Sequence, residues 1–223
     1  MKNDKHLQST SKTVLQPIVI PNLLSQKDSL SLIHYHLQHK HLRTVGDGSD
    51  YRAIDFCHIK TPWVRDIFRR SAQACTSHIF KETGQHFYPE MLALNEWDIG
   101  GVQKPHFDTY SNSEINEGAV PQEGNSREWT CILYLNDNYN GGQTYFPPSE
   151  TFPIGHEHPP QAGEGLLFQG LYLEHGVETV RRGPRHTISM WFTDIEDRII
   201  PDSPIELDQN QHQIHRQNSY TPR

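Results

Sequence analysis

The stretch Met91-Leu-Ala-Leu-Asn-Glu-Trp-Asp-Ile99 opens the series of short segments that decides the fold. The series continues with EWTCILYLN (128–136), GLLFQ (165–169), HGVETV (175–180) and HTISMWF (186–192), and residues such as Gly, Pro and Asn separate its members. Short apolar or alternating runs with turn residues between them are typical of antiparallel strands in a sandwich or barrel. We therefore predict a β-sandwich over about residues 90–195.

The segment before this series predicts two helices. VLQPIVIPNLL (14–24) indicates an edge strand and a turn. Ser25 and Asp28 then suit a capping box for a helix that runs to about residue 41. Thr61 and Pro62 suit the start of a second helix, and Gly84 suits its end. We expect both helices to support one sheet, so that the fold is mainly β with N-terminal helices.

The domain organisation follows from these patterns. We predict a single domain over 13–200, with helical support in 13–89 and the β core in 90–200. Residues 1–12 are polar and charged and predict a disordered N-terminus, and residues 201–223 predict a flexible C-terminal tail. The polar, acidic segment 110–127 predicts a mobile loop over the mouth of a site.

Composition limits the classes of partner. The formal net charge of −7 disfavours a general nucleic-acid binder, which needs a basic face. An apolar run long enough to span a membrane is absent from the sequence, so we expect no membrane partner. Three widely spaced cysteines predict reduced thiols and a cytoplasmic protein.

A candidate metal motif lies in Lys104-Pro-His-Phe-Asp108. Alternate residues of a strand point to the same side, so His106 and Asp108 can address one ion. His175, at the start of another predicted strand, suits a third ligand. Two histidines and one carboxylate form the facial triad of non-haem iron(II) oxygenases. A chain with fifteen histidines contains about one His-x-Asp by chance, so the motif alone is not specific.

A basic side chain strengthens this interpretation. Arg185 begins a predicted strand in which both sets of alternating residues are largely covered. A buried guanidinium requires an anionic partner, which a dicarboxylic cosubstrate would supply. Tyr134 could donate its hydroxyl to the same carboxylate. A structural Arg–Glu pair is the alternative interpretation of Arg185.

These residues resemble the prolyl 4-hydroxylase-like branch of the 2-oxoglutarate/iron(II) dioxygenases, which includes the hypoxia-sensing prolyl hydroxylases. The resemblance is collinear over about 90–195 and rests on several short motifs. They are Pro105-His-Phe-Asp108, Thr130 to Asn136, Gly141 to Pro147, Gly163 to Phe168, His175, and Arg185 to Trp191. Two departures concern substrate identity more than chemistry. Trp97 stands where a tyrosine is common, and Glu178-Thr-Val-Arg-Arg182 replaces the usual Pro-Val after the second histidine.

The resemblance implies a role for each matching residue. His106, Asp108 and His175 look like the iron ligands and catalytic centre. Arg185, Tyr134 and Thr144 look like the residues that bind the distal carboxylate of 2-oxoglutarate. The fold implied is a double-stranded β-helix (jelly roll) with supporting N-terminal helices.

The activity implied is hydroxylation of an unactivated C–H bond. Fe(II) is the implied cofactor, 2-oxoglutarate and O₂ are the cosubstrates, and ascorbate is a candidate additional reductant. The substrate class implied is peptidyl proline or another amino acid or small metabolite. Two alternatives stay open: a nucleic-acid demethylase with the same iron chemistry, and a non-catalytic jelly-roll metal-binding module. The demethylases usually carry a second arginine where Trp191 stands, and a binding module would not require Arg185 and Tyr134.

Two further histidine groups predict exposed positions. His156-Glu-His158 lies between a glycine and two prolines, which favours an exposed loop over a second metal site. His34, His36, His39 and His41 fall on the first predicted helix. Residues two apart do not share a helix face, so we expect a solvated face there.

Overall fold

The protein, seen in a computed structural model, is described over residues 14–45, 51–108, 127–150 and 152–205. The predicted disordered N-terminus (1–12), nearly all of the predicted loop (110–127) and most of the predicted tail lie outside the described residues. In the part that is described, no helix is both long enough and apolar enough to cross a membrane.

Two α-helices precede most of the strands, as the sequence predicts. Helix α1 spans Gln26–Gln38 and helix α2 spans Pro62–Thr83, with short 3-10 helices at Lys40–Leu42, Phe56–His58 and Glu196–Arg198. The strands are β1 (Ile18–Ile20), β2 (Thr44–Val45), β3 (Tyr51–Asp55), β4 (Tyr88–Trp97), β5 (Gln103–His106), β6 (Trp129–Tyr134), β7 (Asn140–Gly141), β8 (Thr144–Phe146), β9 (His156–His158), β10 (Gly165–Phe168), β11 (His175–Val177), β12 (Val180–Arg182) and β13 (Arg185–Thr193).

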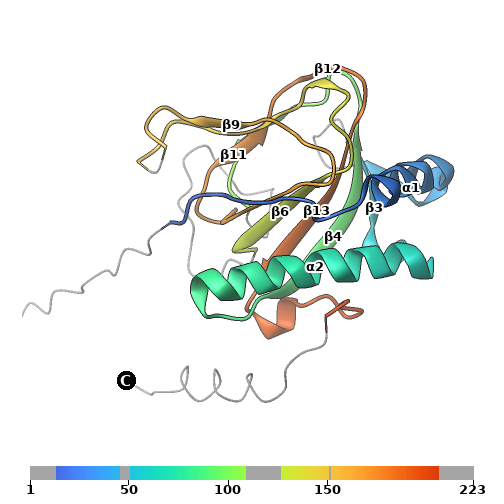
Figure 1. Cartoon of the computed structure of the whole chain (residues 1–223), viewed down its shortest axis with the longest axis horizontal. Coiled ribbons are helices and arrows are strands. Elements are labelled where there is room, and N and C mark those ends of the chain that lie inside the picture. Colours follow the sequence, from blue (N-terminus) through green and yellow to red (C-terminus); the bar gives the residue numbers. More distant parts are fainter. Residues whose placement is uncertain (1–13, 46–50, 109–126, 151, 206–223) are drawn as a thin grey trace, which may run out of the picture.

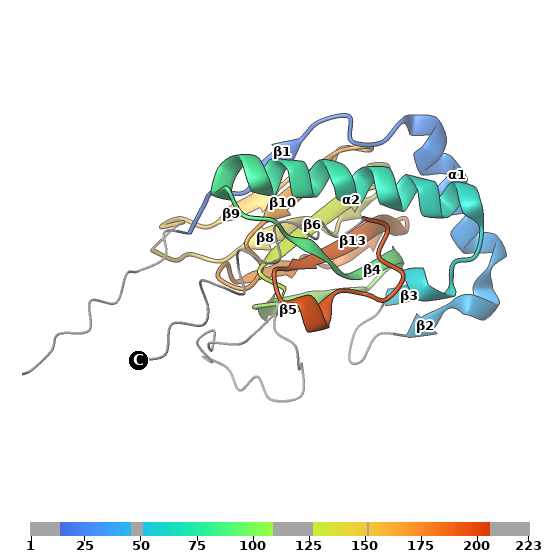
Figure 2. The same cartoon turned by 90° about the horizontal axis from the view of Figure 1, so that it is seen from below.

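The strands form two main antiparallel sheets. The larger has the order β1-β10-β6-β13-β4-β3-β2, and the smaller has the order β5-β11-β8-β9. Strands β12 and β7 form a separate pair. Helix α2 runs across one side of the larger sheet, and α1 lies at the end near β3 (Figures 1 and 2). This arrangement is consistent with the predicted double-stranded β-helix and its supporting helices, and β1 is an edge strand as expected.

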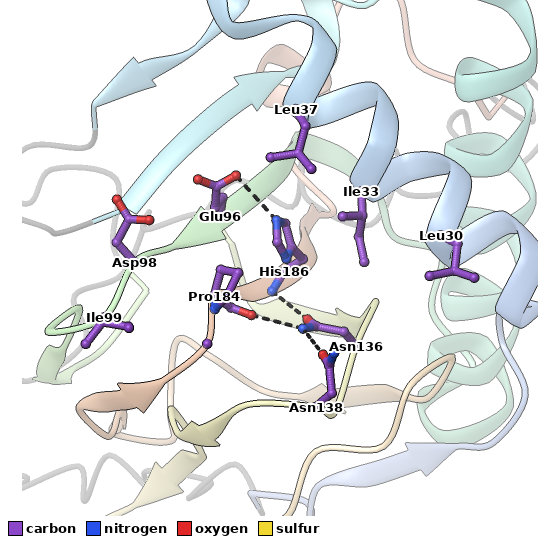
Figure 3. Close-up of a pocket in the computed structure, with 11 residues that line it drawn as sticks. Leu30, Ile33, Leu37, Glu96, Asp98, Ile99, Asn136, Asn138, Pro184 and His186 are labelled. Atoms are coloured by element: carbon purple, nitrogen blue, oxygen red, sulfur yellow. Dashed lines mark hydrogen bonds and ion pairs between the residues drawn. The ribbon is translucent and has the colours of Figure 1, made fainter.

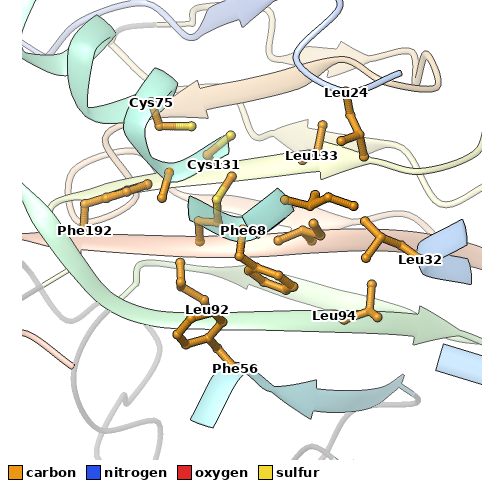
Figure 4. Close-up of a cluster of buried hydrophobic side chains, with 14 of the residues drawn as sticks. Leu24, Leu32, Phe56, Phe68, Cys75, Leu92, Leu94, Cys131, Leu133 and Phe192 are labelled. Atoms are coloured by element: carbon orange, nitrogen blue, oxygen red, sulfur yellow. The ribbon is translucent and has the colours of Figure 1, made fainter. Parts of the chain in front are cut away.

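Alternation along the strands gives the larger sheet two different sides. Trp129, Cys131 and Leu133 of β6 belong to the main apolar core, which also contains Phe68 of α2 (Figure 4). Each large apolar side chain buried in this way contributes about 1.5–3 kcal/mol to folding. We call this the helix-facing side. The intervening residues, such as Tyr134, lie on the opposite, inner side, where they meet the smaller sheet.

The helix boundaries confirm most of the predicted signals. The Ser25 side chain accepts a hydrogen bond from the Asp28 N–H (3.1 Å), which caps α1. Gly84 ends α2 in the left-handed conformation (φ 69°), and its N–H bonds to the Phe80 carbonyl. Thr61 is the N-cap residue of α2 and Pro62 lies in its first turn, as predicted, although the Thr61 hydroxyl donates to the Tyr35 hydroxyl (3.3 Å) and caps no backbone N–H.

Both predictions about the other histidines need correction. Residues 156–158 form strand β9 rather than a loop, because this segment pairs with β8. His158 is buried there, and its Nε2 lies 2.7 Å from Glu164 Oε1. The solvated histidine face on α1 is wrong for His36, which is fully buried against β4.

Candidate active site

Three side chains from distant parts of the chain meet between β5 and β11. His106 and His175 are directly paired residues of these two strands, and their ring centroids are 4.5 Å apart. Asp108 follows β5, and its N–H donates to the Gly170 carbonyl (2.9 Å). Its carboxylate lies 3.7 Å from His106 Nε2 and 3.5 Å from His175 Nε2. The structure therefore brings together all three predicted metal ligands.

Backbone carbonyls orient both imidazole rings. His106 Nδ1 lies 3.0 Å from the Lys104 carbonyl oxygen, and His175 Nδ1 lies 2.9 Å from the Leu173 carbonyl oxygen. A carbonyl can only accept a hydrogen bond, so each Nδ1 carries the proton. The Nε2 atoms therefore face Asp108 and can hold a metal, an arrangement that is usual for histidine ligands.

The Asp108 carboxylate is held in a closely fitted position. The Thr130 hydroxyl donates to its Oδ2 atom (2.5 Å) from the inner side of β6. Gly170 lies so close that a β-carbon there would overlap both the Asp108 carboxylate and the Thr130 hydroxyl. Absence of a side chain at position 170 is thus a condition for the position of Asp108.

The electrostatics of the three residues suit a divalent cation. Burial alone would raise the pKa of Asp108, but the two histidines and Thr130 outweigh it and lower that pKa, so the carboxylate is ionised. Burial lowers the pKa of His175 to about 4, so its ring is neutral. Burial opposes protonation of His106, yet the contacts with Asp108 outweigh it and raise the pKa. A cation would replace the proton that His106 attracts.

The predicted cosubstrate residues also converge, behind the three ligands. Arg185 is only 1% exposed, and its guanidinium donates to the Thr144 hydroxyl (3.3 Å). The Tyr134 hydroxyl donates to the same Thr144 oxygen (2.8 Å). The Arg185 guanidinium also lies 5.5 Å from the ring centroids of both Tyr134 and Trp97. Among the described residues, Arg185 makes no ion pair, so the alternative of a structural Arg–Glu pair is not supported.

Several buried polar atoms on the inner side lack a partner among the described residues. A buried polar group without a hydrogen bond is costly, so such atoms indicate a polar ligand or water. Adjacent positions of β4 and β13 supply four of them: Arg185 Nε, Trp97 Nε1, Asn95 Oδ1 and Thr187 Oγ1. The space beside Arg185 therefore suits an anionic molecule with several hydrogen-bonding oxygens.

The structure adds Tyr139 to this pocket, a residue that the sequence analysis missed. Its hydroxyl is buried, and Arg185 is among the charged groups that act on it. Burial raises the pKa of Tyr139, so the hydroxyl stays protonated and can donate. Both side chains lie against Gly142, whose positive φ of 67° favours glycine. A tyrosine two residues before Gly141-Gly142 and five residues after Tyr134 was the available signal.

The donor set and the pocket fit Fe(II) and 2-oxoglutarate together. Two imidazoles and one carboxylate leave positions of an iron ion open for other ligands. The ionised Asp108 and the neutral His175 need no proton loss to bind the metal. Thr144 is the pair partner of Val177, two residues along β11 from His175, which corresponds to ~7 Å. That separation suits a five-carbon dicarboxylate that bridges the two groups.

Comparisons with known proteins agree with this geometry. Residues 92–193 match the sequence profile of the 2OG-Fe(II) oxygenase superfamily. Prolyl 3-hydroxylase 1 of Homo sapiens is 36% identical over 100 residues, which cover 39% of this chain and 14% of the human protein. Prolyl 3-hydroxylase 1 of Gallus gallus is 32% identical over 107 residues, 45% of this chain and 15% of that protein. The chain thus matches only a small part of these relatives' length.

Solved structures with the same fold include two prolyl hydroxylases. The viral collagen prolyl hydroxylase of Paramecium Bursaria Chlorella virus-1, in complex with 2OG, has a TM-score of 0.58 and 17% identity. The alignment covers 81% of this chain and 96% of that one. A prolyl hydroxylase from Trichoplax adhaerens has a TM-score of 0.59 and 16% identity, over 82% of this chain and 85% of that one.

The family profile covers the segment that contains the three converging ligands and Arg185, and the solved relatives share its fold. Over residues 92–193 the chain is similar to the 2OG-Fe(II) oxygenase superfamily, and it is prolyl hydroxylase-like in sequence and in fold.

Proposed function

We propose that this chain hydroxylates proline within a peptide, with iron held by His106, Asp108 and His175. The observation that carries the proposal is the convergence of these three side chains, with the buried Arg185 behind them. The prolyl hydroxylases among the relatives support the substrate class. When bound, Fe(II) and 2-oxoglutarate supply the oxidation: O₂ is consumed, succinate and CO₂ are released, and a C–H bond becomes C–OH.

The residues of the chain then bind and orient. Arg185, Tyr134 and Thr144 hold the distal carboxylate of 2-oxoglutarate, and Tyr139 adds a hydroxyl beside them. A guanidinium with a free Nε–H can bind such a carboxylate through two parallel hydrogen bonds. Burial of this pocket keeps water away and strengthens the ion pair.

Thr130 and Gly170 act on the carboxylate ligand. The Thr130 hydroxyl occupies one lone pair of Asp108 Oδ2, which leaves the other oxygen directed at the His106 side of the site. The absent side chain at Gly170 allows this position. Asp108 is therefore held in place before a metal binds, which reduces the cost of ordering a ligand on binding.

The open side of the site lies toward His106. The His106 side chain is 19% exposed, whereas Asp108 and His175 are each 7% exposed. Trp191 is partly exposed on the inner side of β13, where it pairs with Thr130, the partner of Asp108. Arg127 lies over its ring, 5.6 Å from the centroid, and pairs with Glu90 (3.2 Å). We assign Trp191 to the wall that a prolyl ring would contact.

Turnover of 2-oxoglutarate to succinate tests this proposal. The iron-loaded protein is incubated with peptides that contain proline, with the same peptides carrying alanine instead, and with free proline. We expect succinate and a peptide heavier by one oxygen only with the proline peptides. Hydroxylation of the alanine peptides, or of free proline alone, would show that peptidyl proline is the wrong substrate class.

A further inference from the structure

A second group of two histidines and one carboxylate lies on the helix-facing side of the larger sheet. Glu96 of β4 and His186 of β13 are directly paired residues, and His36 comes from α1. Glu96 Oε2 lies 3.1 Å from His36 Nδ1 and 3.3 Å from His186 Nε2. All three residues are buried. We call His36, Glu96 and His186 the anchor cluster.

Two arginines complete the surroundings of Glu96. Arg43 lies 3.4 Å from Oε2, and Arg52 lies 3.3 Å from Oε1. Arg43 also donates two hydrogen bonds to the His36 carbonyl oxygen (2.8 and 3.1 Å), so it holds the end of α1 as well. By residue type the cluster could hold a metal ion, but two guanidinium groups already neutralise its carboxylate. It is a buried hydrogen-bond network, centred on Glu96, that joins α1, β4 and β13.

The network sits at the floor of a groove of about 650 Å³ between α1 and the ends of β4 and β13. Figure 3 shows Glu96 and His186 beneath Ile33 and Leu37 of α1, with Asn136 on the far side of His186. The His186 N–H donates to the Asn136 side-chain oxygen (2.8 Å). His186 is therefore fixed through both its ring and its backbone.

The anchor cluster lies directly behind the 2-oxoglutarate pocket. Arg185 is the first residue of β13 and Trp97 is the last residue of β4, and the two are paired across the strands. The next pair is His186 with Glu96, which points to the opposite side of the sheet. A strand slipped by one residue would turn Arg185 toward the helices. The contact between His186 and Glu96 thus supports, at the end of β13, the register that directs Arg185 inward.

We propose that Glu96, held by His36 and His186, is a positioning residue for Arg185 and thereby sets the affinity for 2-oxoglutarate. This inference rests on the proposed function, because it takes Arg185 as the partner of the cosubstrate. Glu96 touches neither the cosubstrate pocket nor the metal ligands; it acts through the pairing of β4 with β13. Loss of its charge frees the end of β13 and weakens cosubstrate binding.

Binding of 2-oxoglutarate to protein loaded with Mn(II), which substitutes for iron without turnover, tests the inference by calorimetry. We expect Glu96→Gln to raise the Kd about tenfold, the size typical of losing a supporting partner of a ligand. His36→Gln removes only the contact between α1 and Glu96, so it should raise the Kd less. Ile79→Val, a core change in α2, serves as the control for a general loss of stability.

A double-mutant cycle with Arg185→Ala separates positioning from a general effect. If Glu96 acts through Arg185, Glu96→Gln adds no further loss of affinity in the Arg185→Ala background. An unchanged Kd in Glu96→Gln, or an equal further loss in the double variant, would overturn the inference. If Arg185→Ala itself leaves the Kd unchanged, the cosubstrate assignment in the proposed function fails instead.

Discussion

Two clusters, each of two histidines and one carboxylate, lie on opposite sides of the larger sheet in different surroundings. On the inner side, His106 and His175 face Asp108; on the helix-facing side, His36 and His186 face Glu96. Among the described residues, no arginine or lysine forms an ion pair with Asp108, whereas Arg43 and Arg52 both reach Glu96. The first carboxylate is left for a cation, and the second is already neutralised.

The difference teaches that the ligand set alone does not identify a metal site. Both histidines of the inner cluster present Nε2 to the carboxylate, because backbone carbonyls hold each Nδ1. In the anchor cluster the two rings use different atoms, Nδ1 of His36 and Nε2 of His186. Orientation and neighbouring charge therefore favour the inner cluster as the metal site and the anchor cluster as a support of the fold.

The largest effect is expected for Asp108→Ala. Removal of the only acidic ligand leaves two imidazoles, so iron binding and 2-oxoglutarate turnover should be lost. Succinate formation at saturating 2-oxoglutarate measures this. Glu96→Gln is the matched control and should keep its kcat under those conditions. Equal losses of succinate formation in the two variants would contradict the assignment of different roles to the two clusters.

Arg185→Ala should have the next largest effect. The change removes the cation that faces the cosubstrate, at a cost of about 2–5 kcal/mol of binding. The KM for 2-oxoglutarate should rise steeply, and the rise should be smaller in Arg185→Lys because lysine keeps the charge. The dependence of the initial rate on 2-oxoglutarate concentration gives this result. An unchanged KM in Arg185→Ala would refute the assignment.

Gly170→Ala should weaken metal binding while the donor set stays intact. The new methyl group would overlap Asp108 and Thr130, so the carboxylate must move. We expect Fe(II) affinity to fall about 10–100-fold, as for other changes that disturb the orientation of a ligand. Anaerobic metal titration measures it, with Ser77→Ala, an exposed change on α2, as the control. Equal affinity in both variants would speak against a fixed Asp108.

The smallest effect concerns the pH dependence of stability. Burial lowers the pKa of His36, although Glu96 opposes this and Arg43 and His186 add to it. Below the pKa of about 6.5 that histidine has in the unfolded chain, His36 binds a proton in the unfolded state but stays neutral in the folded state. Stability from this source is present above that pH and is lost as the pH falls toward the folded pKa.

Urea unfolding of the metal-free protein at pH 7.5 and 5.5 measures this effect. The free energy of unfolding should fall toward acid pH by at most about 1.4 kcal/mol per pH unit from this one group. The fall should be smaller in His36→Gln. Glu96 does not interfere, because its pKa is lowered and its stabilising effect is lost only at more acid pH. Identical pH profiles for the two proteins would show that His36 is not the titrating group.

The inner side of the sheet could be predicted well from the sequence. Alternation along 185–192 assigns Arg185 and His186 to opposite faces of one strand, and the collinear motifs indicate His175 as a ligand. The direction of side chains repeats every second residue along a strand, so a short stretch of sequence is enough to assign each residue to a face. Thr130 opens one of the collinear motifs, but its hydrogen bond to Asp108 depends on a segment 22 residues away.

The anchor cluster could not be predicted in the same way. His36 was one of several histidines on a helix, and nothing local showed which one faces the sheet. Glu96 joins it across 60 residues, and His186 joins Glu96 across 90. For β9, the flanking prolines suggested a loop, whereas pairing with β8 decides its structure. Contacts between distant segments determine both outcomes, and no local pattern contains them.

Metal analysis of the wild type, Asp108→Ala and Glu96→Gln after anaerobic loading with Fe(II) tests the central claim most directly. Our account predicts one iron per chain in the wild type and in Glu96→Gln, and almost none in Asp108→Ala. Iron retained in Asp108→Ala but lost in Glu96→Gln would contradict it, because the metal would then belong to the helix-facing side of the sheet.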